Sequence, residues 1–144
     1  MVVLSCAVKN SIACALLQSD GKVIQRSTYH LSADVAGSVY QSLLDVLGVG
    51  MRFLKQHVEE TGTQEVIIQI NNGTVKKWFD KGYAKPEYNT LFSTVYSILD
   101  DTPVEYSFQL TDALFAKKFL ASKYIVKPAI TSSADFFGGL MDDD

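Results

Sequence analysis

Residues 65–78 read Glu-Val-Ile-Ile-Gln-Ile-Asn-Asn-Gly-Thr-Val-Lys-Lys-Trp, and this stretch carries the clearest structural signal in the chain. Residues 66–70 form a short apolar run that predicts a buried strand. The run stops at Asn71 and Asn72, and a short helix is predicted over residues 74–81. Ligands of open α/β sheets bind at the carboxyl ends of strands. We therefore expect the two amides to lie where a site would form.

Hydrophobic periodicity divides the rest of the chain into further elements. Strands are expected over residues 2–8, 11–18, 22–31 and 104–110, and helices over residues 38–60, 86–99 and 112–124. Asp20 and Gly21 supply hairpin chemistry between the second and third strands. Gly48 and Gly50 interrupt the long helix, which predicts a break or a close helix–sheet contact there. The order β-β-β-α-β-α-β-α predicts an α/β fold with a mixed five-stranded sheet flanked by helices.

The composition fits a single globular domain without a membrane span. The chain has 144 residues, of which 47% are apolar and 20% charged. No apolar run approaches the roughly 18 residues that cross a bilayer. The first residues read as a strand and not as a leader, so a cytoplasmic location is expected.

The cysteines and histidines suggest no cofactor site. Cys6 and Cys14 lie in adjacent apolar runs and could face each other across a hairpin. Reduced, buried thiols are the expected state in the cytosol. His30 and His57 lack the paired spacing of a zinc site, so neither a metal nor a cofactor is expected.

Charge is distributed unevenly along the chain. The net charge is −3, but residues 1–130 carry +1 and residues 131–144 carry −4. The acidic stretch also contains Gly-Gly and small polar residues, which favour flexibility. We therefore predict a folded domain over residues 1–128 and a flexible acidic tail over residues 129–144.

The order of elements and two local patterns resemble the ribonuclease H-like fold, in its type 1 ribonuclease H arrangement. Residues 17–24, Leu-Gln-Ser-Asp-Gly-Lys-Val-Ile, look like that family's second hairpin. Residues 66–78 are similar to its fourth strand and following helix. The likeness covers residues 1 to about 124. It implies a scaffold on which four carboxylates would hold two catalytic metal ions.

Most of those carboxylate positions hold no acid in this chain. The first-strand position falls within residues 5–7, the first-helix position within residues 39–41, and the fourth-strand position on Asn71. Only the last position is matched, by Asp112, which could instead cap a helix. Asn71 and Asn72 could likewise be turn or cap residues. Because Mg²⁺ sites depend on anionic carboxylates, the resemblance implies a catalytically degenerate member with no catalytic residues.

Lysines and aromatic side chains interleave in two places. Cations follow the phosphates of single-stranded nucleic acid, and aromatic rings stack on its bases. The predicted nucleic-acid-binding residues are Lys76, Lys77, Trp78, Lys81, Lys85, Lys117 and Lys118. The alternative is a solvated face of mixed charge, because acidic residues share both regions.

The acidic tail resembles the C-terminal peptides of single-strand-binding proteins, which recruit replication partners and compete with nucleic acid. The predicted partner-binding residues are Phe136, Phe137, Leu140, Met141, Asp142, Asp143 and Asp144. The alternatives are that the two phenylalanines pack back on the domain, or that the tail only adds solubility.

The favoured function is a non-catalytic nucleic-acid-binding protein with a regulatory or partner-recruiting tail. Single-stranded DNA is the expected ligand, and the resemblance implies an accessory factor of phage-type replication or recombination, in the host cytoplasm if viral. A protein–protein interaction adaptor is the second possibility. A divergent metal-dependent nuclease or resolvase is the third, and it would need Asp45, Asp80 and Asp112 to converge.

Overall fold

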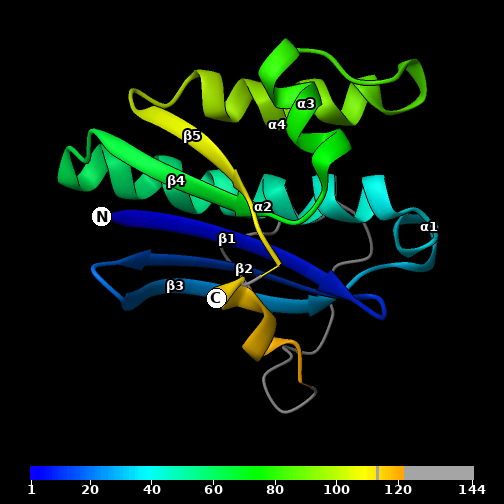
Figure 1. The fold of residues 1–144 in the computed structure, drawn as a ribbon, viewed down its shortest axis with the longest axis horizontal. Coiled ribbons are helices and arrows are strands. Elements are labelled where there is room, and N and C mark those ends of the chain that lie inside the picture. Colours follow the sequence, from blue (N-terminus) through cyan, green and yellow to red (C-terminus); the bar gives the residue numbers. More distant parts are fainter. Residues whose placement is uncertain (113, 122–144) are drawn as a thin grey trace.

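The computed structural model describes residues 1–112 and 114–121. Five strands form one sheet in the order β3-β2-β1-β4-β5, as Figure 1 shows. The strands are β1 (Val2–Lys9), β2 (Ile12–Ser19), β3 (Lys22–His30), β4 (Glu65–Ile70) and β5 (Glu105–Leu110). β1, β2 and β3 pair antiparallel, whereas β4 pairs parallel with both β1 and β5. The predicted mixed five-stranded sheet is therefore confirmed.

The two hairpins are made by tight turns with positive φ. Asn10 and Ser11 join β1 to β2 with φ of 52° and 67°, and Asp20 and Gly21 join β2 to β3 with φ of 51° and 81°. Two consecutive central residues with positive φ match the twist of the flanking strands. The turn predicted at Asp20 and Gly21 is thus confirmed.

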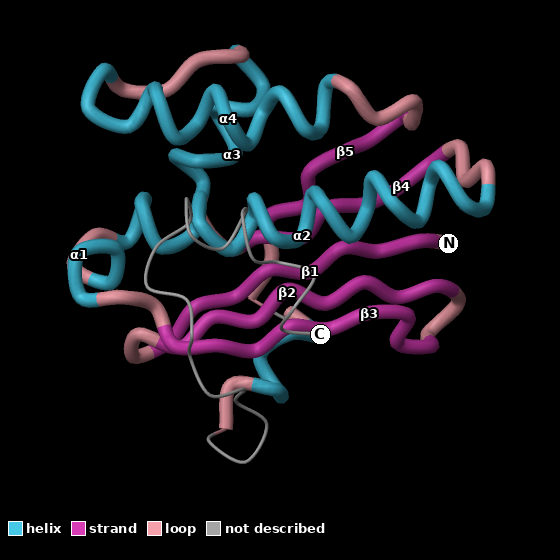
Figure 2. Tube along the Cα trace, turned by 180° about the vertical axis from the view of Figure 1, so that it is seen from behind, coloured by secondary structure: helices cyan, strands magenta, loops and turns pink. Residues whose placement is uncertain are grey.

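The helices lie mainly on one face of the sheet. They are α1 (Ala33–Ala36), α2 (Val39–Thr61), α3 (Gly73–Lys81), α4 (Asn89–Asp100) and the 3-10 segments η1 (Pro86–Tyr88) and η2 (Phe115–Phe119). Figure 2 shows α2 lying across the sheet, with α4 beside it. Side chains of α2, α3 and α4 share one core with the inner face of the strands. Among the helices of the described residues, none is long and apolar enough to cross a membrane.

α2 approaches the central strand closely at Gly50. A Cβ atom at this position would lie 2.9 Å from Leu4 Cδ1 and 3.0 Å from Cys6 Sγ, both on β1. The helix runs unbroken through Gly48 and Gly50. Of the two alternatives that the glycines left open, the close helix–sheet contact is the one observed.

The α-helix expected over residues 112–124 is wrong for the part of that range that the structure describes. The Thr111 amide donates to the Ile70 carbonyl at 2.9 Å, so strand pairing continues to this residue. The Ala116 amide then donates to Ser5 Oγ at 3.1 Å, across 111 residues of sequence. Because this amide is bonded to β1, the segment forms η2 and not a longer α-helix. η2 packs on the face of the sheet opposite α2, against β1 and β2.

Cys6 and Cys14 do not face each other, contrary to one possibility considered above. Cys6 lies opposite Ala15 and Cys14 opposite Ala7, so the two side chains project to different faces of the sheet. Both are buried, free thiols. Burial raises the pKa of Cys14 to about 11 and that of Cys6 further.

Candidate functional site at the carboxyl end of the sheet

The carboxyl ends of β4 and β5 form a pocket of about 420 Å³. Its lining consists of Asn71, Gly73, Leu110, Thr111 and Asp112. Asn71 and Asp112, the third and fourth of the positions considered above, are therefore brought to one place. Both side chains are exposed to solvent.

A second pocket, also of about 420 Å³, lies on the other side of Asn71, between the β1–β2 turn and the start of α2. Its lining residues are Val8, Lys9, Asn10, Ser11, Ala36, Val39, Ser42, Leu43, Asn71 and Asn72. Asn72 has a structural role, because its Oδ1 accepts a hydrogen bond from the Val75 amide at 3.0 Å and caps α3. The cap expected among the two asparagines is thus Asn72, and Asn71 is the amide shared by both pockets.

The acidic residues considered for a nuclease site do not converge. Asp45 is buried in the core, where the Tyr29 hydroxyl donates to its Oδ2 at 2.7 Å. Asp80 lies on α3 and accepts from Lys76 Nζ at 3.1 Å. Asp112 lies in the pocket beside Asn71. Residues 1–112 and 114–121 hold no group of three or more histidine, cysteine or acidic side chains that could bind a metal ion.

The first-strand position is also unsuited to a metal. Ser5 is fully buried, and its Oγ accepts the hydrogen bond from Ala116. One carboxylate and one amide remain at the carboxyl end, and Mg²⁺ draws most of its binding energy from several anionic oxygens. The residues present therefore do not fit a two-metal centre.

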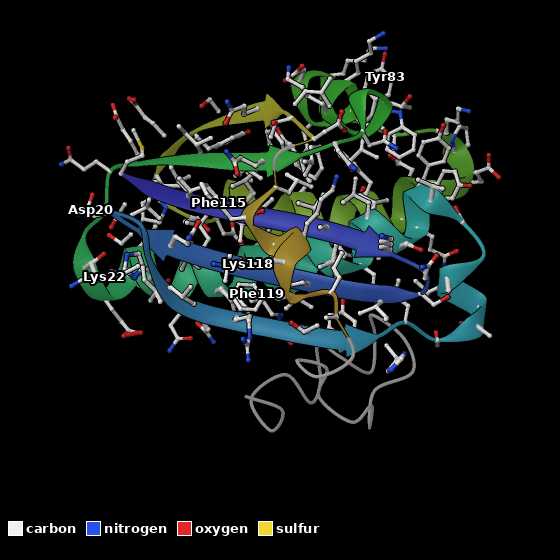
Figure 3. All side chains as sticks on the ribbon, turned by 60° about the horizontal axis from the view of Figure 1, so that its bottom comes forward. Asp20, Lys22, Tyr83, Phe115, Lys118 and Phe119 are labelled. Atoms are coloured by element: carbon white, nitrogen blue, oxygen red, sulfur yellow. The ribbon has the colours of Figure 1, made fainter. Side chains whose placement is uncertain are left out.

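The first predicted basic cluster lies on and after α3. Lys77, Lys81 and Lys85 are exposed, whereas Lys76 is paired with Asp80. Tyr83 is 61% exposed, and Lys81 Nζ lies 5.8 Å from the centre of its ring. Lysines and an exposed ring thus share this surface. Figure 3 labels Tyr83, which marks its position.

Trp78 does not belong to that surface. Its side chain is only 6% exposed, and its ring lies 5.3 Å from Tyr40 and 5.7 Å from Tyr88, measured between ring centres. In this position the indole cannot stack on a base, in contrast to the expectation for this residue. Its spacing from Val75 and Phe79 on one helical face indicates a core position, a signal that the sequence contained.

The second predicted cluster lies on η2. Lys117 and Lys118 are exposed, and Lys118 Nζ lies 5.0 Å from the centre of the Phe119 ring. Arg26 of β3 lies over the same ring at 4.7 Å, and sequence reasoning did not select it. Since α3 and η2 pack on opposite faces of the sheet, the two clusters are carried by opposite sides of the molecule. The predicted partner-binding residues of the tail lie outside the described residues.

Comparisons with known proteins support the fold. No protein-family model and no curated protein sequence matches this chain. Among solved structures, LC11-RNase H1 in complex with an RNA/DNA hybrid is similar, with a TM-score of 0.58, 11% identity and coverage of 81% of this chain and 90% of that chain. The fold is ribonuclease H-like.

Two further ribonuclease H-like structures show the same similarity. The N-terminal RNase H domain of Rv2228c from Mycobacterium tuberculosis, solved as a fusion with maltose-binding protein, has a TM-score of 0.58 and 13% identity, covering 85% of this chain and 91% of that chain. RNase H1 from the archaeon Halobacterium salinarum has a TM-score of 0.55 and 10% identity, covering 85% and 94%. The TM-scores above 0.5 establish a shared fold, and the fold class predicted from the sequence is confirmed.

Proposed function

We propose that this chain is a non-catalytic nucleic-acid-binding protein built on a ribonuclease H-like fold. The observation that carries the proposal is the surface formed by α3 and the residues that follow it, where the lysines Lys77, Lys81 and Lys85 and the ring of Tyr83 are all exposed. Such a combination suits phosphates and bases together. A protein of the same fold, LC11-RNase H1, was solved in complex with an RNA/DNA hybrid, which supports nucleic acid as the class of ligand.

The absence of catalysis is inferred from the site at the carboxyl end of the sheet. Asp112 shares its pocket with the neutral amide of Asn71, and Ser5 of β1 is bonded to η2. An amide supplies an oxygen but no negative charge, so this set lacks most of the attraction that divalent ions require.

Single-stranded DNA is the proposed ligand, and replication or recombination accessory work of the phage type is the proposed context, in the cytoplasm. Lys76, which is paired with Asp80, adds a weaker contact to the first cluster, and Lys117 and Lys118 form a second contact surface. Tyr83 takes the stacking role first expected of Trp78, since its ring is exposed and the indole is buried.

The acidic residues 131–144 are proposed to recruit a protein partner or to compete with nucleic acid for the lysines. This proposal rests on sequence, because these residues carry a net charge of −4 and four large apolar side chains. A division into a folded domain over residues 1–128 and a tail over residues 129–144 belongs to the same proposal.

Fluorescence anisotropy with labelled single-stranded and duplex DNA and RNA tests the proposed function. We expect the full chain to bind single-stranded DNA and to leave the probe intact after incubation with Mg²⁺, as checked on a denaturing gel. A triple variant, Lys77→Gln, Lys81→Gln and Lys85→Gln, should weaken binding. A variant with the same charge change elsewhere, Lys9→Gln, Lys22→Gln and Lys55→Gln, should weaken it less.

Two results would contradict the proposal. Cleavage that requires Mg²⁺ and is abolished by Asp112→Asn would establish a nuclease. Failure of the full chain to bind any of the four probes would favour the protein-interaction adaptor, for which the edge strand β5 offers a surface. Tyr106 and Leu110 on that strand are 38% and 53% exposed, and an exposed edge can accept a strand from a partner.

A further inference from the structure

One continuous row of side chains crosses the face of the sheet opposite α2. The pairing of the strands places in register Arg26 of β3, Leu16 of β2, Ser5 of β1, Gln69 of β4 and Gln109 of β5. η2 covers the first three of these positions: Phe119 lies under Arg26, Leu16 is buried against η2, and Ser5 is bonded to Ala116. Gln69 and Gln109 continue the row beyond η2.

η2 is held against the sheet by apolar packing, next to the point where the row passes from Ser5 to Gln69. Its buried residues, Leu114, Ala116 and Leu120, pack on β1 and β2. Phe115 adjoins Ala116 in sequence, yet its side chain is 48% exposed. Figure 3 looks onto this face and shows Phe115 and Lys118 on η2 in front of the strands. An apolar ring is thus presented to solvent on a fixed support.

Beyond η2, the row carries a pair of amides, Gln69 and Gln109, with unused hydrogen-bonding capacity. Gln69 Nε2 donates to Gln109 Oε1 at 2.8 Å. Gln69 is 9% exposed, and its Oε1 accepts no hydrogen bond from the residues that the structure describes. Buried polar atoms are nearly always paired. The Gln69 oxygen can therefore accept a hydrogen bond from a ligand. The NH₂ group of Gln109, which is exposed, can donate one to the same ligand.

We propose that Phe115, Gln69 and Gln109 form a base-binding platform for single-stranded nucleic acid. A base would stack on Phe115, and its edge would exchange hydrogen bonds with the amide pair, because base edges present adjacent donors and acceptors as amides do. Lys117 and Lys118 would contact the neighbouring phosphates. This inference rests on the proposed function and extends it, since it adds a contact with bases to the contacts with phosphates.

The chemistry of the row favours an unpaired nucleic-acid strand over an acidic polypeptide. An acidic polypeptide would be attracted by Arg26, Lys117 and Lys118, but it would use neither the exposed ring of Phe115 on η2 nor the amide pair of the row. A duplex keeps its base faces stacked and hidden from the protein. A single strand uses all of these groups, because its bases are free to stack on aromatic side chains.

The test compares two strands of equal length, one with bases and one abasic throughout, so that the phosphates are the same. We expect the full chain to bind the strand with bases about tenfold more tightly, as stacking of a base on one ring contributes. Phe115→Ala and Gln109→Ala should each reduce this preference, and Phe115→Tyr should preserve it. Ile24→Ala, an exposed apolar substitution on β3, should leave it unchanged. All variants are compared by thermal unfolding: Phe115 is exposed, so its replacement should not affect folding, whereas Gln109→Ala removes the acceptor of the Gln69 amide and should lower the unfolding temperature slightly.

The outcomes separate this proposal from the proposed function. Equal binding of both strands, or a preference that survives Phe115→Ala, would overturn the platform while leaving phosphate binding by the lysines in place. Tighter binding of polyglutamate than of either strand would overturn the platform in favour of an acidic polypeptide partner. Failure to bind either strand would overturn the proposed function, and the platform with it.

Discussion

The hydroxyl of Tyr29 on β3 donates a hydrogen bond to the carboxylate of Asp45 on α2, at 2.7 Å, inside the core. The two side chains are 5% and 2% exposed. Burial and the neighbouring carboxylate raise the pKa of Tyr29 well above its ordinary value of 10.0. The edge strand β3 is therefore joined to α2 by a polar contact. The carboxylate depends on its donors, because unpaired buried charge is costly.

Removing the Tyr29 hydroxyl should destabilise the fold. Tyr29→Phe leaves Asp45 buried without this donor, and we expect the free energy of unfolding to fall by about 2 kcal/mol. Urea unfolding followed by circular dichroism measures the change. Tyr88→Phe is a matched control: its hydroxyl lies 3.1 Å from Ser38 Oγ at a half-buried position, where water can replace the bond. An equal loss in the two variants would contradict this account.

The protein should lose stability with rising pH from about pH 9. Burial raises the pKa of Cys14 from 9.0 to about 11, and it also raises the pKa values of Cys6 and Tyr29 well above their ordinary values. The unfolded chain therefore releases these protons at lower pH than the folded chain does, so stability that is complete below pH 9 declines above it. Each group contributes a slope of about 1.4 kcal/mol per pH unit within its window. Urea unfolding between pH 8 and 11 measures the slope, which Cys14→Ala should reduce.

The close contact at Gly50 predicts that Gly50→Ala destabilises the protein, whereas helix propensity alone would predict that it stabilises the protein. Gly50→Ala adds a methyl group 2.9 Å from Leu4 Cδ1, and overpacking of this kind costs about 1–3 kcal/mol. That cost exceeds the gain of about 1 kcal/mol from replacing a helical glycine. Gly37→Ala is the control, since its nearest atom, the Ala33 carbonyl oxygen, would be 3.9 Å away. A thermal shift of Gly50→Ala at or above that of Gly37→Ala would refute the prediction.

Phosphate contact by the α3 cluster should be visible in the salt dependence of binding. If Lys77, Lys81 and Lys85 each contact a phosphate, their joint replacement by glutamine should reduce the slope of log K against log salt concentration by about 2 for single strands. Anisotropy titrations at several salt concentrations give the slope. Lys76→Gln should change it less, because Asp80 already neutralises that lysine. An unchanged slope in the triple variant would exclude these contacts.

The acidic tail predicts competition with nucleic acid. Replacing Asp142, Asp143 and Asp144 by asparagine in the full chain removes three negative charges, and we expect tighter binding of single-stranded DNA at low salt. The effect should fade at high salt, where exposed charges are screened. Replacing Asp34, Glu59 and Glu60, exposed acids elsewhere, controls for net charge. Equal effects of the two triple variants would show that net charge alone acts.

Much of the fold follows from local sequence. Alternation and apolar runs predict the five strands, and the Asp20-Gly21 turn sets one hairpin. Local sequence could not predict that η2 replaces the expected last α-helix, because the partner of the Ala116 amide is Ser5, which is 111 residues away in the sequence. Tertiary hydrogen bonding of this kind leaves no periodic signal near residue 116.

The candidate site was also predictable only in part. Asn71 and Asp112 each follow a strand, and strand ends meet at one edge of a parallel pair, so their proximity could be expected. The prediction of an exposed Trp78 was wrong, because it was based on the neighbouring lysines. The helical spacing of Trp78 from Val75 indicates instead that both residues lie in the core. Arg26 gave no signal, since it stands alone on a strand and meets Phe119 only in the folded protein.

The hydrogen bond from Ala116 to Ser5 also orders events while the chain is being made. β1, β2 and β3 can pair soon after they leave the ribosome, because their contacts are local. The outer face of β1 and β2, with Ala7, Cys14 and Leu16, then stays bare until residues 114–120 arrive to cover it. A growing chain stalled before that point would expose this apolar surface, which is prone to aggregate with other chains and to bind chaperones. Emergence of residues 114–120 is thus the step that covers this face of the sheet.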